Sequence, residues 1–158
     1  MKQIPGFLFF ILFSISVNGQ QWVQTYYPGT KQIREKYRVI IQDKDTLREG
    51  PYFIFYENGN LWQNGVFYKN NLDSLWLDFH PNGRLKQKLP YRNGQLQGSV
   101  YTYDINGTLF QKIPFVDDKI NGELLIYYPN GNIQESISYI NDKKNGVYRA
   151  YFEDGVLA

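Results

Sequence analysis

A repeat of 24 residues constrains this chain more than any other feature of its sequence. An Asn-Gly or Asp-Gly pair recurs at this spacing, and so does a second column that is glycine at all but one of its positions. The pairs begin at Asn58, Asn82, Asn106, Asn130 and Asp154, and the second column comprises Gly50, Ser74, Gly98, Gly122 and Gly146. A fixed period of this length is typical of repeat proteins, in which each unit packs on its neighbours.

Each Asn-Gly or Asp-Gly pair lies between segments rich in aromatic and β-branched residues. This pattern predicts a β-hairpin, so every repeat should supply two strands. Pro81 and Pro129 each directly precede a pair, and proline has no backbone N–H, so a two-residue hairpin that needs this donor is excluded. We predict a type I turn from His80 to Gly83, in which the glycine is left-handed and forms a bulge.

The predicted fold is an all-β, elongated antiparallel meander of β-hairpin repeats with about ten strands and a length of roughly 50 Å. Composition agrees with strands, because 18% of the residues are aromatic and alanine, the best helix former, occurs only twice. We divide the chain into a signal peptide at 1–19, a degenerate first repeat with a longer loop or widened hairpin at 20–49, and regular repeats at 50–158.

The predicted turn places Phe79 opposite Leu85, and alternation along the strand then puts Leu85, Leu89 and Tyr91 on one side. We expect a single core face made of three columns. They are Phe55, Phe79, Tyr103, Tyr127 and Tyr151; Leu61, Leu85, Leu109, Ile133 and Leu157; and Phe67, Tyr91, Phe115 and Tyr139. The opposite face mixes aromatic and charged residues, as protein interfaces do. Its candidate partner-binding residues are Tyr52, Trp62, Trp76, His80, Tyr128 and Tyr148.

The first nineteen residues have the pattern of a secretory signal peptide. Lys2 precedes an apolar run from Phe7 to Val17, and Val17 and Gly19 fit a small-residue cleavage site. The run is shorter than the roughly 20 residues that a membrane-spanning helix needs, so we expect no stable membrane span. We expect a mature chain that begins at Gln20 and lies in the periplasm, at the cell surface or outside a bacterial cell.

Composition argues against several classes of function. The chain has no cysteine, one histidine and a formal charge of +2, so disulfide frameworks, zinc knuckles and thiol nucleophiles are excluded and nucleic acid is not an expected partner. The single histidine, His80, directly precedes a turn proline, so we expect a surface turn residue rather than a catalytic base. The acidic pairs Asp43 with Asp45 and Asp117 with Asp118 lack the six to eight oxygens that Ca²⁺ takes. We expect no enzyme activity, no catalytic or metal site and no cofactor.

The repeat unit resembles the variant MORN repeat, in the form found in the YwqK-like antitoxin family. The likeness is strong over residues 50–158 and weak over residues 26–49. Tyr127, Tyr128, Asn130, Gly131, Ile133, Tyr139 and Gly146 stand at the aromatic, turn, leucine, tyrosine and glycine positions of that pattern. Ser74, and Lys69 with Asn70, depart from it. Residues 103–109 are also similar to a YD repeat of large secreted shell-forming proteins, but only this unit has the Tyr-Asp pair.

The signal-peptide pattern and the repeat architecture together predict an exported, non-enzymatic binding or scaffold protein that mediates protein-protein interaction. The alternative is a YwqK-type antitoxin or immunity protein that binds and neutralises a toxin. The strand from Gly146 to Phe152 lacks a full partner in the predicted array, and an unpaired strand edge is a template for another chain. We therefore expect self-association or strand addition at this edge.

Overall fold

The structure, a computed structural model, describes residues 11–13, 19–42 and 45–158. These residues form 14 antiparallel strands in one open sheet and no helix, which confirms the predicted all-β meander. The strands are β1 (Ile11–Phe13), β2 (Gln20–Tyr26), β3 (Ile33–Gln42), β4 (Asp45–Phe55), β5 (Leu61–Tyr68), β6 (Asn71–Phe79), β7 (Leu85–Arg92), β8 (Gln95–Leu96), β9 (Gly98–Tyr103), β10 (Leu109–Val116), β11 (Lys119–Ile120), β12 (Gly122–Tyr127), β13 (Ile133–Ile140) and β14 (Lys143–Ala150).

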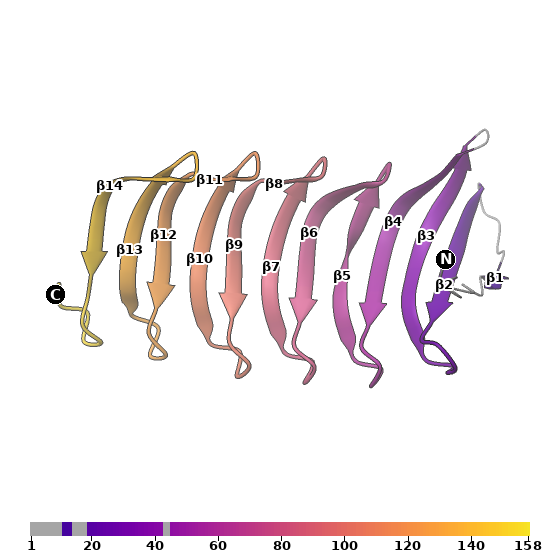
Figure 1. Cartoon of the computed structure of the whole chain (residues 1–158), viewed down its shortest axis with the longest axis horizontal. Coiled ribbons are helices and arrows are strands. Elements are labelled where there is room, and N and C mark those ends of the chain that lie inside the picture. Colours follow the sequence, from indigo (N-terminus) through magenta and orange to yellow (C-terminus); the bar gives the residue numbers. More distant parts are fainter. Residues whose placement is uncertain (1–10, 14–18, 43–44) are drawn as a thin grey trace, which may run out of the picture.

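Strands that follow one another along the chain lie side by side in the sheet (Figure 1). The two-residue strands β8 and β11 pair with β7 and β10 and stand outside the main order. The sheet has more strands than the ten or so predicted, partly because one residue outside any strand, Gln97 or Asn121, separates β8 from β9 and β11 from β12.

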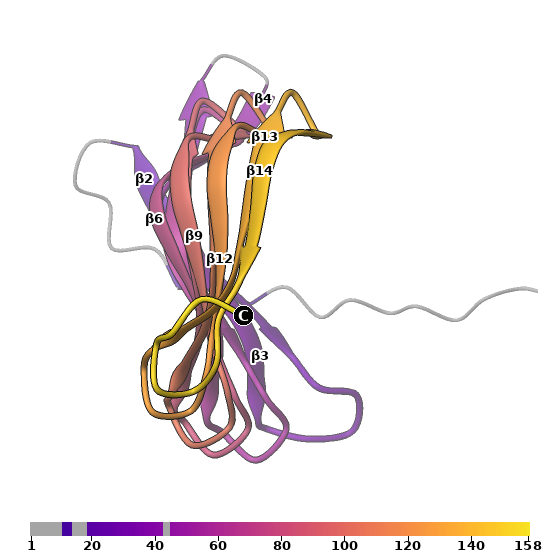
Figure 2. The same cartoon turned by 90° about the vertical axis from the view of Figure 1, so that its left-hand side faces the viewer.

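The sheet is a single twisted layer, as the view along the array shows (Figure 2). Among the described residues no second layer covers either face. Side chains are therefore shielded from water only by their neighbours on the same face of the sheet. The largest side chains bury the most surface in this way.

The predicted turns are confirmed. Gly83 donates its N–H to the His80 carbonyl at 2.8 Å, and His80 donates to the Arg84 carbonyl at 2.7 Å. Gly83 has a φ of +81°, as the left-handed bulge position requires. The same pair of bonds closes the turns that begin at Tyr56, Asp104, Tyr128 and Phe152.

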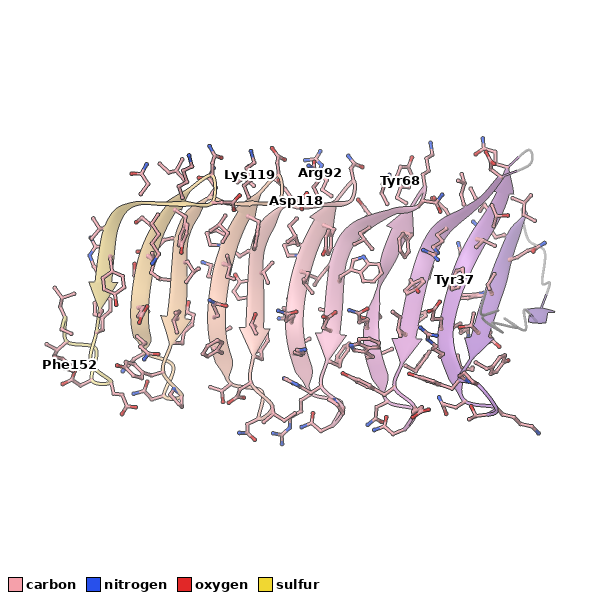
Figure 3. The ribbon with its side chains drawn as sticks, in the orientation of Figure 1. Tyr37, Tyr68, Arg92, Asp118, Lys119 and Phe152 are labelled. Carbon is pink, nitrogen blue, oxygen red and sulfur yellow. The ribbon has the colours of Figure 1, made fainter. Side chains whose placement is uncertain are left out.

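At the opposite ends of the strands, residues 69–70, 93–94, 117–118 and 141–142 form two-residue turns. Both residues of each of these four turns have positive φ, for example 49° at Asp117 and 63° at Asp118, which identifies type I′ turns. Each of these turns is hydrogen-bonded to the preceding repeat. For example, the N–H of Leu96 donates to Asp118 Oδ1 at 2.7 Å, and the N–H of Asp118 donates to the Leu96 carbonyl at 3.1 Å. Figure 3 shows Asp118 on this edge of the sheet with Tyr68, Arg92 and Lys119.

The N-terminal segment is part of the same sheet. The longer loop or widened hairpin expected before residue 50 is a hairpin, because β3 and β4 pair as far as Gln42 opposite Asp45. Residues 43 and 44 lie outside the described residues. The predicted signal peptide also lies outside them apart from residues 11–13, which pair with β2, and Gly19.

Candidate functional site

An extra residue near the start of the second strand of each repeat decides which side chains share a face. In β7, Leu85 lies opposite Phe79 as predicted, but Gln87 lies opposite Asp78. The register shifts at the same place in β3, β5, β10 and β13. Each shift is a β-bulge, in which two residues of one strand oppose one residue of its partner. Because of the bulge, the residues that follow it lie on the opposite face of the sheet from the one expected from the turn.

The expected single core face is therefore wrong. Phe79 and Leu85 lie on one face, whereas Leu89 and Tyr91 lie on the other, where they pack against Trp76. The most buried column is the one that the sequence assigned to the mixed face, since Tyr52, Trp76, Val100 and Leu124 are all buried.

The two faces of the sheet carry different side chains. The tryptophan face carries Tyr52, Trp76, Leu89 and the residues that pack with them. The lysine face is the opposite one and carries Lys36, Lys88 and Lys112.

Three aromatic side chains form the centre of the tryptophan face. Tyr52, Phe67 and Trp76 are 7%, 9% and 6% exposed. The Phe67 ring meets the other two edge to face, with centroids 5.1 Å from Tyr52 and 5.3 Å from Trp76. Trp76 Nε1 donates to the Val66 carbonyl at 3.1 Å. The ring lies against Gly65, where an added Cβ would come within 2.2 Å of it.

An open hollow of about 290 Å³ lies on this cluster. Its lining residues are Tyr52, Ile54, Gln63, Phe67, Leu72, Trp76, Asp78, Leu89 and Tyr91. A concave, mostly apolar surface with a few polar groups is the usual form of a binding site.

Asp78 is the acidic group of the hollow. Gln63 Nε2 donates to Asp78 Oδ1 at 3.0 Å. Burial raises the pKa of the Asp78 carboxyl above its ordinary value, although the Gln63 hydrogen bond and the positive charge of Lys86 oppose the rise. The pKa values of Tyr56 and Tyr91 are raised too, first by burial and then by the Asp78 charge. A partly desolvated carboxylate of this kind favours a donor or cation from a bound partner.

Arg48 supplies the positive charge on the same cluster. Its guanidinium carbon lies 5.3, 5.8 and 5.5 Å from the ring centroids of Tyr37, Tyr52 and Phe67. Burial raises the pKa of Tyr52 to about 12, the Glu35 carboxylate adds to the rise, and Arg48 opposes it. The cluster is thus aromatic at its centre with both signs of charge around it.

The six predicted partner-binding residues share the tryptophan face but differ in exposure. Tyr52 and Trp76 are buried within the cluster, whereas Trp62 is 39% and Tyr148 57% exposed. Trp62 stacks on Tyr56 with ring centroids 5.5 Å apart. Trp62 is therefore the predicted residue that combines an exposed ring with a place next to the hollow.

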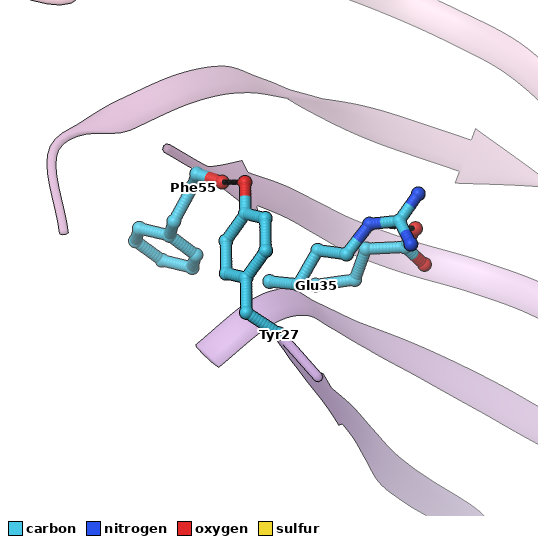
Figure 4. A network of polar contacts seen from close by, with 4 residues as sticks. Tyr27, Glu35 and Phe55 are labelled. Carbon is cyan, nitrogen blue, oxygen red and sulfur yellow. Dashed lines mark hydrogen bonds and ion pairs between the residues drawn. The ribbon is translucent and has the colours of Figure 1, made fainter. Parts of the chain in front are cut away.

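His80 and Tyr128 tie neighbouring repeats together. The Tyr128 hydroxyl donates to the Tyr151 carbonyl at 2.8 Å, and His80 Nε2 lies 3.1 Å from the Tyr103 carbonyl oxygen. Two earlier tyrosines make the same bond, from Tyr27 to the Phe55 carbonyl at 2.7 Å (Figure 4) and from Tyr56 to the Phe79 carbonyl at 2.8 Å. These contacts give His80 and Tyr128 a structural role.

The sequence did not single out Gln63, Asp78 or Arg48. One signal could have located the hollow: a column of Gln63, Gln87, Gln111 and Glu135 is polar although it should lie in the predicted core. A polar column at that place indicates that the strand has changed face.

Within the described residues, no group of three or more His, Cys, Asp or Glu side chains could hold a metal ion. The same residues include no helix that is long and apolar enough to cross a membrane.

Comparison with known proteins agrees with the repeat geometry. Residues 48–70, 72–93 and 120–141 each match the family described as MORN repeat variant. No curated protein sequence matches the chain. The segment between the second and third matches keeps the same turn and bulge, in β9 and β10, but has Asp104 where the matched turns have Tyr56, His80 and Tyr128. The chain therefore carries repeats of the MORN variant type.

Proposed function

We propose that this protein is an exported, non-enzymatic scaffold that binds a protein partner on its tryptophan face. The hollow over Tyr52, Phe67 and Trp76 carries the proposal, because it places a half-buried carboxylate, Asp78, among aromatic and aliphatic walls on an uncovered face. MORN repeats commonly bind proteins or membranes, which supports a binding role.

The composition of the hollow favours a protein partner. Interface cores are enriched in Tyr, Trp, Phe and Arg, and binding energy is concentrated in a few such residues around a pocket. Here the rings of Trp62 and Tyr56 continue the aromatic surface beyond the hollow. A partner side chain with an apolar stem and a donor at its tip fits the walls and the Asp78 carboxylate together.

Two aromatic residues of β5 provide a matched test. Trp62 is 39% exposed on the tryptophan face, and Tyr68 is 47% exposed on the lysine face. Tagged wild-type protein, Trp62→Ala and Tyr68→Ala should be used to capture partners from the native cell envelope and medium. We expect Trp62→Ala to lose the partner and Tyr68→Ala to retain it. Equal retention by both variants would place the partner elsewhere.

Export and the antitoxin alternative are tested by the same preparation. N-terminal sequencing should give a mature chain that begins at or near Gln20, and an intact Met1 in a soluble cytoplasmic fraction contradicts export.

If the captured protein is toxic when expressed alone, and this protein relieves the toxicity, the antitoxin alternative holds.

A further inference from the structure

The lysine face carries more basic than acidic side chains, although the chain as a whole is nearly neutral. In the middle of the strands it carries the cations Lys36, Arg38, Lys88, Lys112 and Arg149. Its acidic side chains at this level, among the described residues, are Asp73 and Glu123. The tryptophan face carries three carboxylates, Glu35, Asp78 and Glu135, and the cations Arg48 and Lys86 lie near them. The lysine face is therefore the more basic of the two, although the net charge of the chain is only +2.

Four cations of the lysine face, Lys36, Lys88, Lys112 and Arg149, lie in one register row across the sheet, with uncharged residues between them. Lys88 pairs with Tyr101, and Tyr101 pairs with Lys112, so the two lysines are in register two strands apart. At the usual strand spacing their Cα atoms are about 10 Å apart. The complete row, in register from β3 to β14, is Lys36, Phe53, Asn64, Leu77, Lys88, Tyr101, Lys112, Leu125, Ser136 and Arg149.

Three of these cations have no ion-pair partner among the described residues. Arg149 lies 3.9 Å from Glu123, but no carboxylate lies within 4 Å of Lys36, Lys88 or Lys112. Lys36 lies over the Trp22 ring at 5.0 Å, and Lys88 lies 5.7 Å from the centroid of the Tyr103 ring. Aromatic faces hold both ammonium groups near the sheet without neutralising them.

We propose that the lysine face binds an acidic segment of a partner protein, which lies along the row of cations and across the strands. The apolar side chains between the cations, Leu77, Tyr101 and Leu125, fit an occupant whose carboxylates alternate with neutral groups. A nucleic acid strand carries a phosphate about every 3.4 Å, so cations roughly 10 to 19 Å apart leave most of its charges unpaired. Lipid headgroups favour dense clusters of basic residues in one plane, whereas this row follows the twist of the sheet.

This surface is separate from the hollow, so the inference does not depend on the proposed function. The probe is a fluorescent peptide of about 12 residues in which Glu alternates with Thr, because in an extended chain its carboxylates then lie on one side about 7 Å apart. A peptide with Gln in place of Glu is the control ligand. Binding to the full chain is measured by fluorescence anisotropy at about 50 mM salt and again at about 1 M, where the Debye length falls to roughly 3 Å.

The decisive variant is Lys88→Glu with Lys112→Glu. Its matched control is Lys31→Glu with Lys69→Glu, which changes the net charge equally at turns rather than on the row. We expect the row variant to weaken binding of the Glu peptide about tenfold or more, the turn variant to change it less than twofold, and high salt to abolish it. Far-UV circular dichroism checks folding, and Lys88→Gln with Lys112→Gln replaces the row variant if that variant is unfolded.

Several results would overturn the proposal. One is the absence of binding by the wild type, and another is equal binding of the Glu and Gln peptides. A third is an equal loss of affinity in the row and turn variants, which would indicate an effect of net charge alone. The last is preferential binding of phosphatidylglycerol vesicles or of a single-stranded oligonucleotide over the Glu peptide, which would assign the row to a different class of partner.

Discussion

At the scale of single residues, Gly65 and Trp76 show how one repeat accommodates an oversized side chain. Trp76 occupies the position of Val100 and Leu124 in later repeats, and Gly65 occupies that of Leu89. A Cβ on Gly65 would lie 2.2 Å from the indole. We predict that Gly65→Ala destabilises the protein by roughly 1 to 3 kcal/mol, because Trp76 must leave its place.

The control for this prediction is the same substitution in a Trp76→Leu background. Without the indole, alanine costs nothing sterically and is the better strand residue, so Gly65→Ala should then be neutral or stabilising by up to about 1 kcal/mol. The measurement is urea unfolding followed by circular dichroism. The same destabilisation in both backgrounds would mean that the two residues are not coupled.

Tyr52 makes stability depend on alkaline pH. Burial raises its pKa from 10.0 to about 12, so between these values the folded protein retains a proton that the unfolded chain loses. The free energy of unfolding must therefore fall as pH rises from about 10 to 12, by no more than about 1.4 kcal/mol per pH unit for this group. Tyr52→Phe should make the fall shallower in unfolding experiments across this range. Tyr68→Phe, which removes an exposed phenol, should keep the wild-type slope.

At the scale of strands and turns, the sequence predicted the turns and misassigned the faces. Pro81 excludes one turn type by its missing N–H, and the Gly83 bond to His80 confirms the other. Nothing comparable marks the bulge, whose column is Trp62, Lys86, Phe110 and Gln134 and has no common residue type. The hydroxyl bonds between repeats were also missed, because their acceptors are backbone carbonyls, which any residue provides.

The bulge predicts a large difference between deletion and substitution of Lys86. Its deletion removes the extra residue of β7, so Leu89 would turn away from Trp76 and leave the tryptophan face. We expect the deletion to cost about 3 kcal/mol or more, as for loss of a buried side chain and its cavity. Lys86→Ala changes an exposed side chain and should cost less than about 0.5 kcal/mol. Equal costs in urea unfolding would show that the register does not depend on this residue.

At the scale of the whole molecule, a single-layer array has no common core to make all its strands equally stable. Each hairpin is stabilised by its own propensity and by contact with its neighbours, so local stability follows local packing. The aromatic cluster of Tyr52, Phe67 and Trp76 lies in β4–β6 and contacts Leu89 and Tyr91 of β7. At the other end, residues 143–149 of β14 are all exposed.

Native-state hydrogen exchange should reveal this gradient directly. We predict the slowest amide exchange in β4–β7, intermediate exchange in β9–β12 and the fastest strand exchange in β14, because opening the first region also exposes the aromatic cluster to water. Trp76→Leu should speed exchange in β5–β7 much more than in β12 and β13, which do not touch it. Uniform exchange across all strands, changed uniformly by the substitution, would instead show that the array opens as one cooperative unit, as domains with a shared core do.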